Sequence, residues 1–482
     1  MSNLWHSCVL KFFKYAPSYV VCLCFMPCGL IFGYTISSFI AERNLRTELI
    51  DYGPLILGAC LALLVALCML ALKYLKRCII YWQPYLLMGV GVFHLLASCF
   101  YFADGFDHVG AYLSYVAHSV TFVAGYSFLL TMSSKSSRSL LMSGCCASYL
   151  LGMAAAVSLI GGSYVKNLDK YAGQQTTPTT EQLIDGIYVN FAATYLSIAV
   201  VVLAVLVGLK VLHVLGTVDM SNSLDNDLRI ANANGSIFES RQEVIKRLQF
   251  FYVTRNTQWH VTLLLLFVEA VQHALFIYLV FWFALNESMR LDDLAHVDAM
   301  CWVICAGSIL TLLFAYFCSL KIIFVSSAVL QLLVTVLAMI LYAVCETKLT
   351  FWLLLLLFGL GYSSLQLLLL EVSAIRFTEL IISISYGLKL LSISIVYFYF
   401  VSNGQNSYFY AKDESTLMAQ GFVFLIITAL LALVVGMRLP RTHRTPLLDI
   451  QYDVYGIIFK KHQIEQLNVR WLNDGTIPTI SQ

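Results

Sequence analysis

Residues 261–285 read VTLLLLFVEAVQHALFIYLVFWFAL, a run that is almost wholly apolar. A helix rises about 1.5 Å per residue, so roughly 20 apolar residues are enough to cross a bilayer. Glu269 and His273 nevertheless lie near the middle of the run, four residues apart and therefore on one helix face. The stretch predicts a membrane helix with two ionisable side chains at the depth where lipid tolerates them least.

The whole chain has the composition of a membrane protein. Of its 482 residues, 60% are hydrophobic and 12% are charged, whereas soluble domains carry about 25% charged residues. A net charge of +2, without a basic run interleaved with aromatics, argues against a nucleic-acid partner. The 14 cysteines form no CxxC pair and no Cys/His cluster with metal spacing, so we expect no disulfide framework, metal or cofactor.

Twelve mostly apolar segments are predicted to span the membrane, which makes the chain an all-α integral membrane protein. The sixth and seventh are separated by the most polar internal stretch, which contains SNSLDNDLRIANANGS. We therefore expect two six-helix bundles, a 6+6 pseudo-repeat, joined by a hydrophilic linker. The predicted spans are residues 17–40, 54–73, 79–101, 109–131, 139–161, 191–213, 260–284, 299–318, 320–345, 351–371, 377–401 and 419–438.

Lys and Arg are shared unevenly between the two sides of this topology. With the N-terminus inside, 21 of them face the cytoplasm and 7 face the other side, while Lys389 falls within a span. Because cytoplasmic loops carry the excess of Lys and Arg, both termini and the linker are predicted to be cytoplasmic. The expected divisions are a cytoplasmic N-terminus 1–16, an N-terminal bundle 17–213, a linker 214–259, a C-terminal bundle 260–438 and a cytoplasmic tail 439–482.

Two short motifs bear on processing and sorting. Asn286-Glu-Ser is a glycosylation sequon in a loop that the topology places outside. In the tail, Tyr455-Gly-Ile-Ile resembles an endocytic sorting signal, so sorting adaptors could bind Tyr455 to Ile458. We expect a plasma-membrane protein, with an endosomal or lysosomal membrane as the alternative.

The chain resembles the major facilitator superfamily of secondary transporters. The resemblance rests on six plus six spans, a long central cytoplasmic loop and both ends inside. The loop after the second span, ALKYLKRCIIYWQP, keeps the basic character of the family signature at Lys73, Lys76 and Arg77, while the family's Asp is absent. The resemblance implies that the two bundles rock about a site near the midplane, with Arg77 in a cytoplasmic gate.

The ionisable residues within the spans are the candidate site. Glu269 and His273 are predicted to carry a proton, because histidine titrates near neutral pH. Lys389 would attract a substrate anion or exchange partners with Glu269. The bland alternatives are a structural Glu269–Lys389 ion pair and an intrahelical Glu269–His273 pair. The candidate substrate contacts are Lys389, Gln366, His118, Tyr34 and Gln272.

A second group of charges lies where the tenth span ends and the eleventh begins. Glu371 and Arg376 are predicted to act with Arg77 as an inner gate that switches ion pairs as the bundles rock. The alternative is a solvated cytoplasmic corner with no role in transport.

Taken together, these features predict a secondary active transporter, embedded in the lipid bilayer, that moves a small polar or anionic organic solute by alternating access, coupled to protons. The alternatives are a uniporter and a transport-inactive, transporter-like receptor or scaffold. A membrane enzyme is disfavoured, since no HxxxH, paired-Asp or Ser/His/Asp arrangement occurs in the sequence.

Overall fold

A computed structural model describes twelve stretches of the chain. They are residues 21–44, 52–74, 83–103, 106–133, 138–171, 187–211, 259–285, 293–345, 349–373, 377–404, 414–439 and 442. Within them the secondary structure is helical. A backbone in lipid must satisfy its own hydrogen bonds, and long apolar segments do so as helices.

The helices follow the order of the predicted spans. The first half of the chain forms α2 (Phe25–Asn44), α3 (Gly53–Tyr74), α4 (Gln83–Phe100), α5 (Asp107–Val120), the π-helix η2 (Thr121–Gly125), α6 (Tyr126–Met132), α7 (Arg138–Tyr171) and α9 (Ile187–Val211). The second half forms α12 (Trp259–Leu285), α13 (Asp293–Phe317), α14 (Leu320–Cys345), α15 (Leu349–Val372), α16 (Thr378–Gly404) and α17 (Glu414–Arg438).

Each predicted span overlaps one of these helices, with α5, η2 and α6 together covering the fourth. Nine helices of the described residues are long and apolar enough to cross a membrane. The other three predicted spans contain shorter apolar helices, which are Tyr85–Phe100, Thr262–Tyr278 and Phe422–Arg438. The all-α membrane character predicted from the sequence is thus confirmed.

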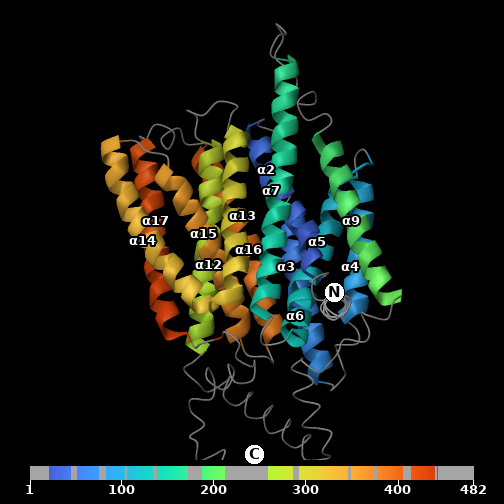
Figure 1. Ribbon diagram of the computed structural model, residues 1–482. Coiled ribbons are helices and arrows are strands. Elements are labelled where there is room, and N and C mark those ends of the chain that lie inside the picture. Colours follow the sequence, from blue (N-terminus) through green and yellow to red (C-terminus); the bar gives the residue numbers. More distant parts are fainter. Residues whose placement is uncertain are drawn as a thin grey trace, which may run out of the picture.

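The two halves of the chain lie on opposite sides of the molecule, as the colours of Figure 1 show. Helices α7 and α3 of the first half pack against α13 and α16 of the second. The long helix α7 therefore has one face toward α2 of its own half and another toward the second half. Side chains on this second face reach the candidate site.

Close helix packing in each half depends on glycine. A Cβ atom built on Gly29 of α2 would lie 1.8 Å from the carbonyl oxygen of Tyr149 of α7. In the second half, a Cβ on Gly307 of α13 would lie 2.3 Å from the carbonyl oxygen of Leu356 of α15. Only a residue without a side chain allows backbones to approach this closely in a membrane.

Two helices are irregular near the site. The helical turn that precedes α2 is interrupted at Cys24, where Pro27 has no N–H to bond the carbonyl of Leu23. Between α5 and α6, residues Thr121–Gly125 form a π-helix, all of it buried. Such single-turn π-bulges are frequent at functional sites.

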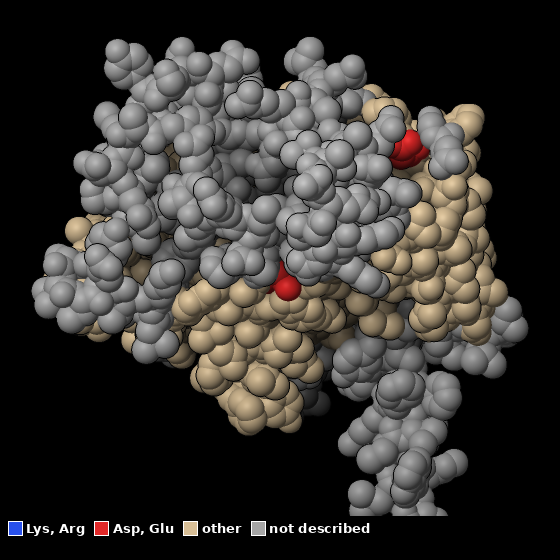
Figure 2. Space-filling view, turned by 90° about the horizontal axis from the view of Figure 1, so that it is seen from above, with Lys and Arg blue, Asp and Glu red and all other residues tan. Residues whose placement is uncertain are grey.

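One end of the molecule is seen in Figure 2. The described residues in this view are mainly uncharged, with one small acidic spot near the middle and another toward the upper right. This is the end toward which α7 extends in Figure 1, and the topology predicted from the sequence assigns it to the side poor in Lys and Arg.

Candidate functional site

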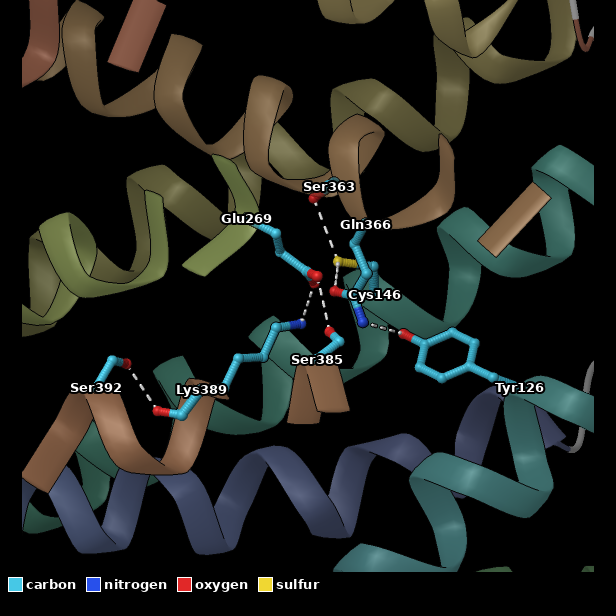
Figure 3. Close-up of polar contacts among 8 residues, drawn as sticks. All are labelled: Tyr126, Cys146, Glu269, Ser363, Gln366, Ser385, Lys389 and Ser392. Carbon is cyan, nitrogen blue, oxygen red and sulfur yellow. Dashed lines mark hydrogen bonds and ion pairs between the residues drawn. The ribbon is translucent and has the colours of Figure 1, made fainter. Parts of the chain in front are cut away.

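A buried ion pair is the centre of the site. Lys389 Nζ of α16 lies 2.8 Å from Glu269 Oε1 of α12. The two residues are 4% and 1% exposed. Figure 3 shows them pointing toward each other from neighbouring helices of the second half. The ion pair between Glu269 and Lys389 that the sequence suggested is therefore present, as a direct salt bridge within the second half.

Both charges have further partners. Ser385 Oγ, one turn before Lys389 on α16, donates a hydrogen bond of 2.7 Å to Glu269 Oε2. Lys389 Nζ lies 5.5 Å from the ring centroid of Tyr362 of α15 and 5.8 Å from that of Phe122 of η2. Cation–π contacts of this length are favourable, especially away from water. Because Phe122 belongs to the first half, the ammonium group contacts both halves.

Hydrogen bonds join the two halves beside this pair. Gln366 Nε2 of α15 donates to the Tyr126 hydroxyl of α6, at 3.1 Å. The Cys146 thiol of α7 lies 3.4 Å from Ser363 Oγ and 3.8 Å from Gln366 Oε1 (Figure 3). Ser363 in turn donates to Ser308 of α13, at 2.7 Å. Gln366, predicted as a cavity residue, thus lies at the junction of the halves.

Two imidazoles beside the pair are buried without a hydrogen-bond partner among the described residues. Neither ring nitrogen of His273 or of His118 has one. The ring centroid of His273 is 5.7 Å from that of Phe32 of α2 and 6.0 Å from that of Tyr362. His118 of α5 is 5.0 Å from Tyr386 of α16. Each imidazole therefore lies between the halves, enclosed by rings, and His273 makes no hydrogen bond to Glu269.

The other two predicted substrate contacts differ from each other. Gln272 is buried on α12 beside Glu269 in sequence, and its side-chain oxygen has no partner among the described residues. Tyr34 stacks on Phe191 of α9, with centroids 4.5 Å apart, and meets Tyr101 edge-on at 5.3 Å. Its ring belongs to an aromatic cluster of the first half, and its contact with a solute stays a prediction.

The charges between the tenth and eleventh spans are enclosed by protein. Glu371 is 0% exposed and accepts a hydrogen bond of 3.1 Å from Ser139 of α7. Glu379, at the start of α16, accepts one of 2.6 Å from Ser127 of α6. Both bonds join the two halves. The alternative of a solvated corner is therefore wrong for Glu371, which is buried at the interface between the halves, and Glu379 beside it in sequence is buried there too.

A second cross-half contact lies further along α7. Ser158 donates a hydrogen bond to Asp298 of α13 and accepts one of 2.7 Å from Trp302 Nε1. Ser158 follows Ser139 by 19 residues, which separates them by about 28 Å along the helix. Cys146 lies between them. The ion pair thus lies between two cross-half contacts, and the described side chains enclose it on both sides.

His94 provides a contrast to the unpartnered imidazoles. Its Nδ1 lies 2.6 Å from the Tyr195 hydroxyl and its Nε2 lies 3.8 Å from the Cys28 thiol. All three residues belong to the first half. His94 is therefore a satisfied structural histidine, bonded on both nitrogens.

Several predicted residues lie outside the described part of the chain. They are the gating residues Arg77 and Arg376, the sequon residue Asn286 and the sorting motif Tyr455 to Ile458. The described residues contain no group of three or more His, Cys, Asp or Glu side chains that could hold a metal ion.

Several site residues carry no sequence signal of their own. Tyr126, Cys146 and Ser385 are ordinary residues of apolar helices, and Phe122 is one of 31 phenylalanines. Only the fold brings them to Glu269 and Lys389. Ser385 alone could have been anticipated, because it precedes Lys389 by four residues and so shares its helix face.

Comparisons with known proteins identify the fold. No family model matches the chain, and no curated protein matches its sequence. Among solved structures, the proton:xylose symporter XylE bound to 6-bromo-6-deoxy-D-glucose has a TM-score of 0.60 at 12% identity, covering 91% of this chain and 99% of that chain. The E. coli fucose:proton symporter FucP has a TM-score of 0.51 at 13% identity, covering 87% and 99%.

The chain has the major facilitator superfamily fold. An inward-open structure of the xylose transporter XylE from E. coli also matches, with a TM-score of 0.53 at 14% identity over 92% of this chain and 100% of that one. The resemblance seen in the sequence is thus confirmed at the level of the fold. At these identities the likeness concerns the fold and assigns no substrate.

Proposed function

We propose that this protein is a secondary active transporter that moves a small polar or anionic organic solute by alternating access, coupled to protons. The observation that carries the proposal is the buried Glu269–Lys389 pair, which belongs to the second half of the fold and contacts the first half through Phe122. Ionisable groups at this depth are unfavourable in lipid and mark solute or proton pathways. XylE and FucP, which share the fold, are described as proton symporters, and this supports the proposal of proton coupling.

Within this proposal, Glu269 carries the proton and Lys389 responds to it. When Glu269 is ionised, the two charges neutralise each other at 2.8 Å. When Glu269 takes up a proton, Lys389 loses its partner and is available to a solute. His273, Gln272, Gln366 and His118 provide the polar groups that orient the solute.

Alternating access follows from the two cross-half contacts along α7. Glu371 and Ser139 close one end of the interface, while Ser158 with Asp298 closes the other. If the halves rock about the site, one contact opens while the other stays closed. We assign Glu371 to the cytoplasmic gate, and Arg77 and Arg376 are its proposed partners.

The proposed topology has twelve crossings with both termini cytoplasmic. Residues 17–213 and 260–438 are the two bundles, and we propose the plasma membrane as the location. Glycosylation at Asn286 tests the orientation. A mass shift that glycosidase treatment removes and that Asn286→Gln abolishes would support an outer location of this loop. Cleavage of the loop by a protease that has access only to the cytosolic side would contradict the proposed orientation.

The function is tested with purified protein in liposomes that contain a pH-sensitive dye. Solute pools are added outside, with protein-free liposomes as the control. The expected result is that at least one pool acidifies the interior only when the protein is present. Folded protein that gives no flux with any pool contradicts proton-coupled transport and favours a uniporter, if labelled solute still enters, or a receptor, if none does.

A further inference from the structure

The charge balance of the site bears on the class of solute. The described ionisable groups around the Glu269–Lys389 pair include Tyr126 of α6, Cys146 of α7 and Tyr362 of α15, which interact with Glu269, and His118 of α5 and His273 of α12, which interact with Lys389. At neutral pH tyrosine and cysteine are uncharged, and histidine largely so. The enclosed site therefore holds one negative and one positive charge, which cancel.

This balance constrains proton uptake. A proton on Glu269 alone would leave the Lys389 ammonium buried without a counter-charge, which is strongly unfavourable. Among the described residues, the Glu269 carboxylate, at 2.8 Å, is the charged partner of Lys389 Nζ, and the Tyr362 side chain and the ring of Phe122 are its uncharged neighbours. A neutral solute could not compensate the ammonium. An anion could, because it would take the place that the Glu269 carboxylate holds.

The same argument constrains an anion that enters without a proton. It would add a second negative charge beside Glu269, and like charges at this distance repel each other in a dry site. A dianion would leave an excess charge even after Glu269 is protonated. The site is neutral again only when one monoanion and one proton are both bound.

The lining indicates what the rest of the solute is like. Phe122, Tyr149 and Tyr386 surround His118, with ring centroids 5.0 to 5.8 Å away. The ring nitrogens of His118 and His273 are buried without partners among the described residues. An unsatisfied buried polar group is unfavourable unless a ligand or water bonds to it. The site therefore suits a compact body with a ring or other flat apolar face and one or more hydrogen-bonding groups.

We propose that the solute is a monocarboxylate with a compact, partly apolar body, and that it binds together with one proton. The proton comes from solution and adds to the Glu269 carboxylate, and the solute carboxylate then replaces Glu269 at Lys389. No covalent bond to the solute forms or breaks. This inference rests on the proposed function and adds to it the charge class of the solute and a reason why proton and solute must bind together.

The test is a binding measurement on the full chain in lipid nanodiscs. Acetate, lactate, benzoate and nicotinate are each titrated by calorimetry beside the matching amide, which has the same shape without the charge. Repeating each titration in buffers of different ionisation enthalpy gives the number of protons taken up per bound solute. At least one carboxylate is expected to bind with uptake of about one proton, and its amide more than tenfold weaker.

The pH dependence has a definite sign. Because binding takes up a proton, affinity falls as pH rises, by about tenfold per pH unit where Glu269 is ionised in the free protein. In Glu269→Gln the carboxyl is replaced by an amide that is neutral at every pH, so the same solute carboxylate is expected to bind independently of pH and without proton uptake. Glu269→Gln with Lys389→Gln removes both charges and leaves neither unpaired. It is expected to fold and to lose carboxylate binding.

Three results would overturn the inference. They are no binding of any of the four carboxylates to folded protein, binding without proton uptake, and equal binding of amide and carboxylate. None of them decides the proposed function, which the dye assay measures separately. Proton flux driven by a neutral solute would uphold the transporter and reject the monocarboxylate.

Discussion

Ser139 and Glu371 are joined by a hydrogen bond of 3.1 Å that connects α7 of the first half to α15 of the second. Both residues are buried. The bond therefore has to break whenever the halves separate at this end. Its strength contributes to how often the halves separate at this end, which the proposed topology places on the cytoplasmic side.

Weakening this contact is expected to favour the form open to the cytoplasm. Ser139→Ala removes the donor and leaves the charge of Glu371 in place. A hydrogen bond to a charged group contributes about 1.5–3 kcal/mol, enough to change the population of the open form more than tenfold. The measurement is alkylation of the buried Cys146, followed by mass spectrometry, with an impermeant reagent added to the cytoplasmic side.

Ser143→Ala is the matched control for that experiment. Ser143 Oγ donates to the backbone carbonyl of Ser139 on its own helix, so the loss of this hydroxyl breaks a bond within α7 and not the hydrogen bond between the halves. Faster labelling of Cys146 in Ser139→Ala than in Ser143→Ala is the expected result. Equal labelling of the two variants would show that the Ser139–Glu371 bond does not hold the gate.

Weakening the contact at the other end, between Ser158 of α7 and Trp302 of α13, is expected to expose Cys146 to the outer side instead of the cytoplasmic side. Trp302→Phe keeps an aromatic ring but removes the N–H that donates to Ser158, at 2.7 Å. Cys146 should then label faster from the outer side and no faster from the cytoplasmic side. Faster labelling from both sides would indicate general loosening of the fold and would contradict a separate outer contact.

The two kinds of buried histidine predict different effects on stability. His118 has no hydrogen bond to lose among the described residues, so His118→Phe should leave the free energy of unfolding unchanged or higher. His94→Phe leaves the Tyr195 hydroxyl without its partner at 2.6 Å and should lower that free energy by about 1–3 kcal/mol. Thermal unfolding of the purified variants measures both. Similar destabilisation of both would mean that His118 has a structural partner.

Glycine-to-alanine substitutions are expected to differ in their effect on stability according to whether the glycine lies against a neighbouring helix. Gly29→Ala places a Cβ atom against the backbone of α7, whereas Gly208→Ala meets nothing within 4 Å. Overpacking typically destabilises by about 1–3 kcal/mol, and more where only backbone can move. We expect Gly29→Ala to lower the unfolding temperature clearly and Gly208→Ala to leave it nearly unchanged. A tolerated Gly29→Ala would mean that α2 and α7 are further apart than described.

The helices and the central charges were predictable because each depends on local sequence. Apolar length gives the spans, and a carboxylate or an ammonium within a span stands out against its neighbours. Glu269 and Lys389 could therefore be predicted to meet. The π-helix at Thr121–Gly125 has no comparable signal, because a helical turn with one extra residue has the same amino-acid composition as the α-helix around it.

The cross-half partners could not be predicted, since they depend on long-range packing. Ser139 and Glu371 are 232 residues apart in sequence, and Tyr126 and Gln366 are 240 apart. A serine in an apolar helix usually bonds its own backbone, as Ser143 does. The stacking of Tyr34 on Phe191 depends on long-range packing in the same way.

The most direct test of the central claim compares wild type with Glu269→Gln in dye-loaded liposomes, using a solute pool that acidifies the wild-type vesicles. We predict that Glu269→Gln abolishes solute-driven acidification but retains exchange of labelled solute across the membrane, because Lys389 and the rest of the site remain. Acidification by Glu269→Gln at the wild-type rate would contradict the claim and leave Glu269 as a structural partner of Lys389.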